Sequence, residues 1–268
     1  MSALLFDSHA HYYDGRFSRE SGGCDTLLRR LFAENVGGIV NVGTDVETSR
    51  TVIAQAGKYP RMFAAVGIHP SDGQRYDDPD AALRDLRELM DTPEKRAAGK
   101  IVALGEIGLD YHYPDTNKPL QAALFDAQLD MAVELGLPVI VHDRDAHGDC
   151  FDAVCRHSAA TGVFHSYSGS AEMARDLVRR GWYISFSGVA TFKNAPRVRE
   201  AIAAVPVERL LIETDCPYLA PHPHRGECNH SGLLHFTASA VAEVKGMGIE
   251  ELIARTAQNA RTLFGIHD

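Results

Sequence analysis

The stretch Leu4-Leu5-Phe6-Asp7-Ser8-His9-Ala10-His11 decides the fold prediction, because a short apolar run leads directly into side chains that can bind a metal. The same transition recurs along the chain, where Glu106, His142, His165 and Asp215 each follow an apolar run. Ligands from strand ends this far apart in sequence converge where a closed parallel barrel brings the C-terminal ends of its strands to one mouth. The pattern predicts a barrel enzyme with a metal centre.

Eight apolar runs are predicted as strands. The runs are continuous rather than alternating, which is typical of strands buried on both faces, and their spacing leaves room for a helix between neighbours. They cover residues 4–6, 38–42, 63–67, 101–105, 138–141, 162–164, 182–186 and 210–212. Eight such units indicate an α/β fold of the (β/α)8 TIM barrel class.

Segments between the runs carry apolar residues at three- and four-residue spacing with charges between them, which predicts amphipathic crossover helices. We expect these helices over residues 80–90, 120–135, 171–180 and 196–204. A loop rich in Pro, His and Gly, residues 216–232, follows the last run, and a helical region over residues 234–263 closes the chain.

Length and composition restrict the number of domains, the cellular compartment and the kind of surface that we expect. A chain of 268 residues suits one large α/β domain, so we expect a single domain over residues 1–268. The five scattered cysteines indicate reduced thiols, and neither an export signal nor a membrane span is evident, which favours the cytoplasm. We expect the protein to be a monomer. A formal charge of −9 argues against a surface that binds nucleic acid throughout, but it allows a mouth that grips one or two phosphates.

His9 and His11 stand two residues apart, so on an extended backbone both imidazoles project from one face and can reach the same cation. Glu106 ends a buried run, where a carboxylate is costly unless a cation or a hydrogen-bond partner compensates its charge. Its two oxygens can also bridge a pair of metals. We therefore predict all three residues as metal ligands.

His142 and His165 end two successive runs, so their imidazoles arrive at the same rim and can share a second cation. Asp215 adds a carboxylate at the end of the last run. A structural role is plausible for each residue alone, but the coincidence of such residues at every rim position favours a functional site. We predict these three residues as further metal ligands.

Seven motifs carry a resemblance to a known family. They are Asp7-Ser8-His9-Ala10-His11, Val66-Gly67-Ile68-His69-Pro70, Gly105-Glu106-Ile107-Gly108-Leu109-Asp110-Tyr111, Val141-His142-Asp143-Arg144-Asp145-Ala146, His165-Ser166-Tyr167-Ser168-Gly169, Thr191-Phe192-Lys193-Asn194-Ala195 and Glu213-Thr214-Asp215-Cys216-Pro217-Tyr218-Leu219. Over nearly its whole length the chain resembles the TatD family of metal-dependent deoxyribonucleases, within the amidohydrolase-like barrels. The third and seventh motifs are the most specific.

The resemblance implies a hydrolase of phosphodiester bonds, acting as a 3′ to 5′ exonuclease on single-stranded DNA. It implies two divalent metal ions, with Mg, Zn or Mn as candidates. The implied ligands are His9, His11 and Asp215 for one ion, His142 and His165 for the other, and Glu106 as the bridge. Asp215 and Glu106 are the implied catalytic residues, with Asp215 orienting the attacking water and accepting its proton.

Further residues beside the predicted mouth are candidates for substrate binding. His69 and His112 follow the third and fourth strands and can donate to a phosphate or orient the leaving group, although packing is an equal alternative. Arg144 can make charge-assisted contacts to phosphate oxygens. Lys193 and Arg225 can do the same, but as loop charges they are at least as plausibly solvated.

One loop departs from the family pattern. Where TatD proteins usually read Arg-Gly-Lys-Arg-Asn-Glu-Pro, this chain has Arg225-Gly226-Glu227-Cys228-Asn229-His230-Ser231, and Ser71 replaces a usual histidine. An acidic residue in place of basic ones weakens the attraction to a long polyanion, so the departure bears on the DNA substrate more than on the metal chemistry.

Two alternative functions and one alternative site stay open. The same barrel supports hydrolysis of small esters, amides or phosphoesters, and a non-catalytic binding or scaffold role is also conceivable. Glutamate at the bridging position, where related amidohydrolases often carry a carbamylated lysine, favours the nuclease branch. A second metal site in the His-rich loop is disfavoured, because Gly and Pro disperse its candidates, His222, His224, Cys228, His230 and His235.

Overall fold

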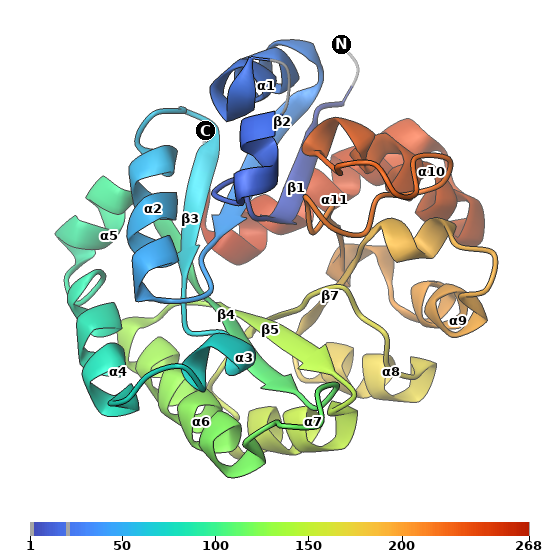
Figure 1. Ribbon diagram of the computed structural model, residues 1–268. Coiled ribbons are helices and arrows are strands. Elements are labelled where there is room, and N and C mark those ends of the chain that lie inside the picture. Colours follow the sequence, from blue (N-terminus) through green and yellow to red (C-terminus); the bar gives the residue numbers. More distant parts are fainter. Residues whose placement is uncertain (1–2, 20–21, 268) are drawn as a thin grey trace. The chain divides into compact units, whose positions relative to one another are not determined.

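The structure is a computed structural model that describes residues 3–19 and 22–267. Its eight strands follow one another in sequence order within one sheet, and the strand pairs with defined residue partners run parallel (Figure 1). The prediction of a (β/α)8 barrel is confirmed. The strands are β1 (Leu5–Ala10), β2 (Val36–Val42), β3 (Met62–Val66), β4 (Ile101–Asp110), β5 (Val139–Arg144), β6 (Gly162–Phe164), β7 (Tyr183–Phe186) and β8 (Leu210–Ile212).

Helices separate and follow the strands, as a (β/α)8 fold requires. The α-helices are α1 (Gly23–Glu34), α2 (Val46–Ala56), α3 (Pro70–Gly73), α4 (Pro79–Glu88), α5 (Pro93–Gly99), α6 (Lys118–Leu135), α7 (His147–Arg156), α8 (Ala171–Arg179), α9 (Pro196–Ala204), α10 (Leu234–Lys245) and α11 (Ile249–Phe264). Short 3-10 helices are η1 (Gly15–Arg19), η2 (Gly188–Thr191), η3 (Val207–Arg209) and η4 (Ser231–Leu233). None of the described helices combines the length and the apolar character that crossing a membrane requires.

Three strands extend beyond the C-terminal ends of their apolar runs. β1 continues to Ala10, β4 to Asp110 and β5 to Arg144, so Glu106 and His142 lie within strands rather than after them. The parallel pairing of β4 with β5 continues through Gly108 and His142, well past the last apolar residue of each predicted run. Backbone hydrogen bonding, which does not depend on side-chain polarity, extends these strands.

The predicted crossover helices are found as α4, α6, α8 and α9, with ends that differ by no more than two residues. The closing region over residues 234–263 is two helices instead of one. α10 ends at Lys245 because Gly246 follows in the left-handed conformation, with φ of 63°, which glycine adopts without steric cost.

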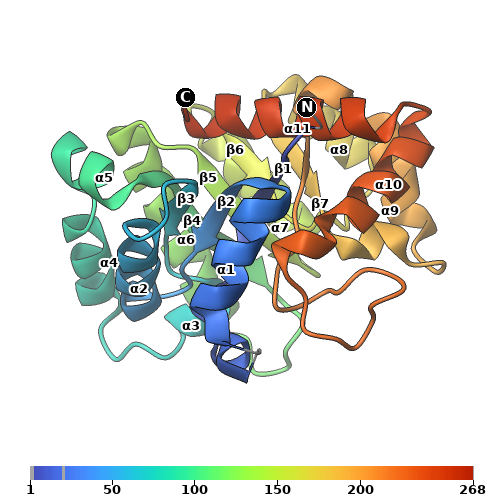
Figure 2. The same ribbon diagram turned by 90° about the horizontal axis from the view of Figure 1, so that it is seen from above.

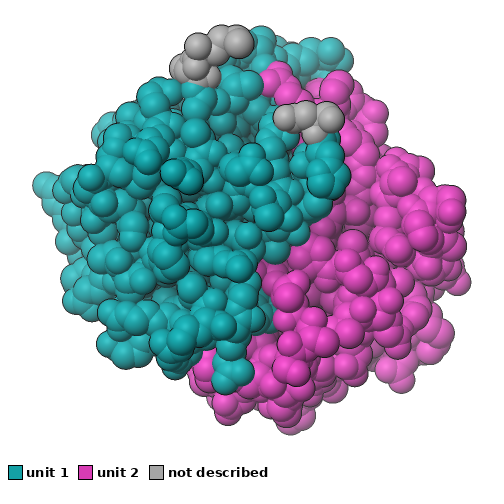
Figure 3. Space-filling model, turned by 180° about the vertical axis from the view of Figure 1, so that it is seen from behind, with its two compact units in different colours: residues 1–41, 165–268 teal, residues 42–164 magenta. Residues whose placement is uncertain are grey.

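The chain divides into two compact units, coloured separately in Figure 3. Unit 1 comprises residues 1–41 and 165–268, and unit 2 comprises residues 42–164. The prediction of one domain over residues 1–268 is not tested by this division and stays a prediction.

Within unit 1, the first and last strands meet. The His11 N–H donates to the Cys216 carbonyl at 2.8 Å, and the Asp215 N–H donates to the His9 carbonyl at 3.0 Å. Helix α11 packs against both β1 and β8 and covers β1 in Figure 2. All six residues of β1 are buried, as predicted for a strand covered on both faces.

Within unit 2, strands β3 to β6 pair in sequence order. Helix α2 packs on β3, and α6 packs on β4 and α3. The chain leaves each of these strands at its C-terminal end and enters a loop or helix there, which places polar residues from β3, β4 and β5 at one edge of the sheet.

Candidate metal centre

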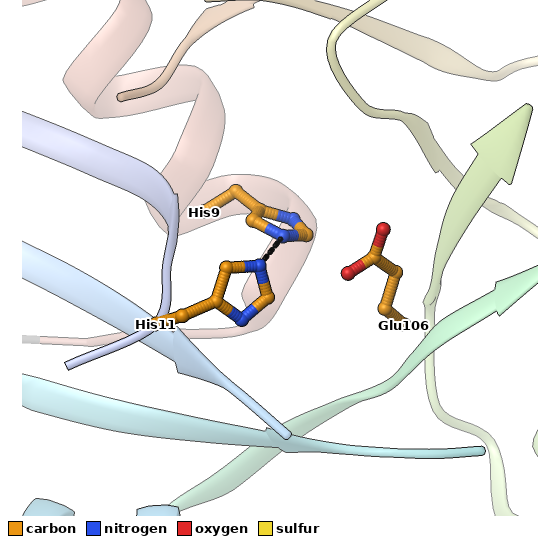
Figure 4. A group of neighbouring side chains, drawn as sticks. All are labelled: His9, His11 and Glu106. Atoms are coloured by element: carbon orange, nitrogen blue, oxygen red, sulfur yellow. Dashed lines mark hydrogen bonds between the residues drawn. The ribbon is translucent and has the colours of Figure 1, made fainter. Parts of the chain in front are cut away.

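His9, His11 and Asp215 form a cluster in unit 1. The Nε2 atoms of His9 and His11 lie 3.0 Å apart, joined by the dashed line in Figure 4. Asp215 Oδ1 lies 3.6 Å from Nε2 of His9 and 3.3 Å from Nε2 of His11. His9 is wholly buried and His11 is 5% exposed, so their nitrogens face a shared interior point.

The meeting of β1 with the end of β8 brings this cluster together. His9 lies inside β1 and His11 directly beyond it, while Asp215 follows β8 with φ of 56°, a left-handed conformation that non-glycine residues adopt at a cost. The Asp215 N–H bonds the His9 carbonyl, which fixes the turn against β1. The backbone therefore sets the distance between the carboxylate and the two imidazoles.

The Asp7 carboxylate of β1 binds residues next to Asp215 and in the loop that follows. It accepts hydrogen bonds from the Thr214 N–H at 2.9 Å, the Thr214 hydroxyl at 2.6 Å and the Ser231 hydroxyl at 2.6 Å. Burial raises the pKa of Asp7 to about 6, although the hydrogen bonds from Ser231 and Thr214 oppose this rise. The network holds Thr214, and with it the adjacent Asp215, against β1.

The carboxyl group of Asp215 experiences opposing influences. Burial alone raises its pKa, but the hydrogen bond with His11 and the positive charge of the neighbouring imidazoles outweigh burial and hold the pKa below its ordinary 3.8. Asp215 is therefore ionised at neutral pH and available as a ligand or a proton acceptor.

His165 joins the unit 1 cluster from the end of β6. Its ring stacks on His9 with centroids 4.1 Å apart and planes inclined by 12°. Nδ1 of His165 lies 3.1 Å from Oε1 of Glu213, and the same oxygen accepts the Ser166 N–H at 2.7 Å. Glu213 is wholly buried, so it fixes the orientation of the His165 ring.

Glu106, His142, Asp110 and His69 form a second cluster, in unit 2. His142 lies between two carboxylates, with Nδ1 at 2.6 Å from Glu106 Oε1 and Nε2 at 3.3 Å from Asp110 Oδ2. Nε2 of His69 is 3.7 Å from the same Glu106 oxygen, and its ring meets that of His142 edge to face. Burial raises the pKa of Asp110, but the bonds to His142 and to the His112 N–H outweigh it and lower the pKa.

Two glutamines of α6 support this second cluster. The Gln121 side-chain carbonyl accepts the Asp110 N–H at 2.9 Å. The Gln128 amide accepts the Ile68 N–H at 2.8 Å and donates to the Ile68 carbonyl at 3.1 Å, directly before His69. Both glutamine side chains are buried, so the ends of β3 and β4 are fixed to a helix.

The donor sets of both clusters fit divalent cations. His9, His165 and Asp215 offer ligand atoms that lie within 4.8 Å of one another, as do His69, Asp110 and His142. Imidazole with carboxylate suits Zn and Mn, and the carboxylates also admit Mg. Buried carboxylates of this kind are costly without a compensating positive charge, which a cation supplies.

Each predicted site residue can be placed. The structure brings together His9, His11, His165 and Asp215 in unit 1, and His69, Glu106 and His142 in unit 2. His112 and Arg144 make other contacts. Nδ1 of His112 lies 3.0 Å from Asp145 Oδ2, and the Arg144 guanidinium lies 5.6 Å from the Tyr113 ring centroid; both residues are exposed.

Asp110 and Glu213 belong to the arrangement but were not predicted as site residues. Asp110 ends the apolar stretch that follows Glu106, so the rule that selected the other ligands also applied to it. Glu213 directly follows the last strand, two residues before Asp215, and its buried position was the available signal. Both contact a histidine predicted as a metal ligand.

A family model described as TatD related DNase matches residues 6–265. The chain belongs to the TatD family of metal-dependent hydrolases. This confirms the family indicated by the sequence motifs, over nearly the whole chain.

Relatives and solved structures of TatD proteins agree with this membership. The chain is 38% identical to "Uncharacterized metal-dependent hydrolase YabD" of Bacillus subtilis, over 98% of this chain and 100% of the relative. It is 35% identical to "Uncharacterized metal-dependent hydrolase TatD" of Mycobacterium tuberculosis, covering 98% of each. The crystal structure of the TatD homologue YjjV from Escherichia coli superposes with a TM-score of 0.90 at 30% identity, covering both chains fully.

The loop that departs from the usual TatD pattern makes local contacts. The Arg225 guanidinium lies 4.2 Å from the Phe192 ring centroid, and Glu227 Oε2 lies 2.9 Å from Nδ1 of His224. At the other departure, the Ser71 N–H donates to Nδ1 of His69 at 3.1 Å. Within residues 3–19 and 22–267, no group of three metal-competent side chains includes a histidine or cysteine of the His-rich loop.

Proposed function

We propose that this TatD protein is a divalent-metal-dependent deoxyribonuclease that removes nucleotides from the 3′ end of single-stranded DNA. The buried imidazoles and carboxylates at the strand ends support the hydrolytic chemistry. The observation that carries the choice of a nucleic acid is a set of guanidinium groups that lie over aromatic rings at or after the C-terminal ends of strands.

We propose that the centre would hold two cations and that one carboxylate would be a ligand of both. The ligands are His9, His11 and Asp215 for the first cation, His142 and His165 for the second, and Glu106, drawn with His9 and His11 in Figure 4, as the bridge. When bound, such a pair activates water and neutralises the charge that develops on phosphoryl oxygens. Mg, Zn and Mn all suit these ligands.

Side chains of the protein position the attacking water and the phosphate and accept the proton of the water. Asp215 is ionised, lies beside His9 and His11, and orients the attacking water while accepting its proton. His69 accepts the Ser71 N–H at Nδ1, so its neutral form carries the proton on Nε2, from where it donates to a phosphate oxygen. Glu106 would supply the carboxylate shared by the two ions.

The stacked pairs give the loops the chemistry of a single-strand binding surface. An aromatic ring stacks on a base, while the adjacent guanidinium contacts a phosphate, and neither contact depends on base sequence. The pairs are Arg16 with Tyr218 at 4.0 Å, Arg225 with Phe192 at 4.2 Å, and Arg144 with Tyr113 at 5.6 Å. Tyr113 and Tyr218 are 49% and 45% exposed, so their rings are accessible to a ligand.

A short footprint on the DNA agrees with the charge of the chain. The formal charge of −9 and the acidic Glu227 in the loop after β8 oppose binding of a long polyanion. A surface that grips the last nucleotides of a strand needs only a few cationic contacts. This favours an exonuclease over an enzyme that binds internal sites, and action as a monomer in the cytoplasm stays a prediction.

The test is turnover of a 5′-labelled single-stranded oligonucleotide, beside a panel of small esters and amides, with Mg, Mn or Zn added. We expect a ladder that shortens from the 3′ end, and its loss in Asp215→Asn but not in the matched surface variant Asp80→Asn. Hydrolysis of the esters or amides alone would establish the amidohydrolase alternative. Cation uptake without any turnover would indicate a binding role.

A second experiment tests whether the protein binds nucleic acid by stacking a base on Tyr218. Tyr218→Ala removes a stacking ring, so its KM for a normal 3′ terminus should rise by about 5- to 150-fold, the equivalent of ~1–3 kcal/mol per stacked base. A terminus that lacks its base offers nothing to stack on, and its KM should be equal for both proteins. Equal losses on both termini would contradict the stacking role.

A further inference from the structure

We propose that Asp14 is a positioning residue that holds the Arg16 guanidinium against the Tyr218 ring, so that ring and guanidinium meet the last nucleotide of a strand in a fixed arrangement. The inference rests on the proposed function for the stacking of a base on Tyr218. It adds a residue that sets substrate affinity without touching the substrate. All three residues belong to unit 1.

The carboxylate of Asp14 accepts four hydrogen bonds. Oδ1 accepts the backbone N–H of Arg16 at 2.8 Å and its Nε–H at 3.1 Å. Oδ2 accepts Nη2 of Arg16 at 3.1 Å and the Tyr218 hydroxyl at 3.2 Å. A carboxylate has about four lone-pair sites, so these contacts use its accepting capacity. Asp14 therefore acts on a ligand only through Arg16 and Tyr218.

The paired contact with Asp14 fixes the plane of the guanidinium. Nε and Nη2 donate to the two oxygens of one carboxylate, the bidentate geometry that gives an arginine a defined orientation. The guanidinium carbon then lies 4.0 Å from the centroid of the Tyr218 ring. The Arg16 side chain is 43% exposed, so without the carboxylate it would rotate in water.

Both partners are anchored to residues of the unit 1 cluster. The Tyr218 N–H donates to the Asp215 carbonyl at 2.9 Å, and the Tyr218 carbonyl accepts Nδ2 of the wholly buried Asn229 at 2.7 Å. The Asp14 N–H donates to the His11 carbonyl at 3.0 Å. The backbone therefore sets the place of the ring and of the carboxylate relative to His11 and Asp215, two proposed metal ligands.

Ordering Arg16 before the substrate arrives lowers the cost of binding, because a long side chain that is immobilised only on binding loses its rotamer freedom at that moment. Two of the five guanidinium N–H groups are committed to Asp14, and the other three can meet a phosphate oxygen. Burial raises the pKa of Asp14, but the hydrogen bonds and the charge of Arg16 outweigh it and lower the pKa below its ordinary 3.8. The carboxylate is therefore ionised at neutral pH.

Asp14→Asn separates the guanidinium contact from the backbone turn. The amide oxygen keeps the Arg16 backbone N–H, the shortest of the four contacts. The NH2 group takes the place of Oδ2 and cannot accept from Nη2, so the bidentate contact and its charge are lost. The substitution preserves size and shape, which separates positioning of Arg16 from a packing defect.

The experiment measures kcat and KM on a single-stranded oligonucleotide for the wild type, Asp14→Asn, Arg16→Ala and the double variant. Asp14→Asn should raise KM by about 2- to 12-fold, the equivalent of ~0.5–1.5 kcal/mol for one immobilised side chain, and leave kcat within about twofold. On the Arg16→Ala background it should change KM by less than about twofold, because no guanidinium is left to position. A purely structural role would instead add to the effect of Arg16→Ala.

A second readout needs neither metal nor DNA. In protein labelled with 15N at arginine, the Nε–H of Arg16 should exchange slowly with water, because Asp14 accepts it at 3.1 Å. Arg16→Ala identifies this signal by its absence. In Asp14→Asn the signal should move toward those of solvated arginines and exchange faster.

Asp25→Asn is the matched control. Asp25 Oδ2 accepts Nε of Arg29 at 2.8 Å, which gives another aspartate–arginine pair of unit 1, with both side chains exposed on α1. This variant should leave KM within about twofold of the wild type.

Active cleavage of DNA with an unchanged KM in Asp14→Asn would overturn the inference alone and leave the proposed function standing. An equal rise of KM on the Arg16→Ala background, or in Asp25→Asn, would overturn it as well, because the effect would not pass through Arg16. A wild type that cleaves no oligonucleotide would contradict the proposed function and with it this inference.

Discussion

The strand ends in unit 1 and unit 2 are held in place by different means. In unit 1, Asp7 of β1 binds the backbone and hydroxyl of Thr214 beside β8, so one strand is tied directly to another by a charged group. In unit 2, the ends of β3 and β4 are tied to α6 by the neutral side chains of Gln121 and Gln128. The same task is performed once by a buried carboxylate and once by amides.

The amide and carboxylate supports differ in what they donate and accept and in the cost of burying them. An amide offers a donor and an acceptor, so Gln128 satisfies both backbone groups of Ile68 without burying charge. A carboxylate only accepts, and its burial has a cost that the raised pKa of Asp7 reveals. Because of the raised pKa, we expect the unit 1 support to depend on pH. Because hydrogen bonds to a carboxylate are stronger than those to a neutral amide, we also expect it to be the stronger support at pH 7.

The largest expected effect tests whether both clusters serve one reaction. His9→Ala and His142→Ala each remove a proposed ligand, one from each unit, and each should lower kcat on a single-stranded oligonucleotide by about 10,000-fold or more. Each should also reduce the zinc content per chain. Full activity in either variant would show that its cluster is not part of the catalytic centre, and exposed His267→Ala is the control.

The next effect concerns the charged support. Asp7→Ala leaves the donors of Thr214 and Ser231 without their carboxylate partner and should destabilise the protein by about 3 kcal/mol at pH 7, measured by urea unfolding. The exposed Asp77→Ala should stay within about 0.5 kcal/mol of the wild type.

The pH dependence of that difference follows from the pKa of Asp7. Because burial raises the pKa from 3.8 to about 6, the stability contributed by Asp7 is fully present below pH 3.8 and is lost as pH rises through 6. The difference between the pKa values of 3.8 and about 6 corresponds to about 3 kcal/mol of free energy of unfolding. The destabilisation by Asp7→Ala should therefore grow by up to about 3 kcal/mol between pH 7 and pH 4. A difference that is constant over this range would contradict a raised pKa.

The smallest effect concerns the neutral support. Gln128→Leu keeps the volume but leaves both polar groups of Ile68 without the amide, and should cost about 2 kcal/mol with no dependence on pH between 4 and 7. Urea unfolding at the two pH values measures this directly. A larger cost than that of Asp7→Ala at pH 7 would reverse the proposed order of the two supports.

The core of each strand could be predicted from sequence, but the strand ends could not. Apolar runs identify residues buried by the hydrophobic effect, so all eight strands were located. The extension of β4 to Asp110 depends on pairing with β5, which a single stretch of sequence does not reveal. Five helices were not predicted, namely α1, α2, α3, α5 and α7.

Two of those helices show why. α3 is only four residues long, too short for an apolar period to appear. α1 begins after Gly22, which has φ of 81° and no side chain to cap the helix, so the usual start signal is missing. Local sequence is silent where tertiary packing determines the element.

For the candidate site, the sequence identified groups that chemistry selects directly. His9, His11 and Asp215 could be predicted as neighbours because strand ends of a barrel converge. Asp110 and Glu213 could not be assigned, because their contacts with His142 and His165 depend on the ring orientations of these histidines in the folded chain.

The packing of α11 on β1 and β8 has a consequence for how the protein is made. Unit 2 is continuous in sequence, whereas unit 1 combines the first 41 residues with residues 165–268. At about 5–20 residues per second, a ribosome needs ~6–25 s to translate the intervening segment, so β1 can pair with β2 early but waits at least that long for β8 and α11. The apolar residues of β1 that α11 covers are exposed to chaperones and to neighbouring nascent chains until that helix has been translated.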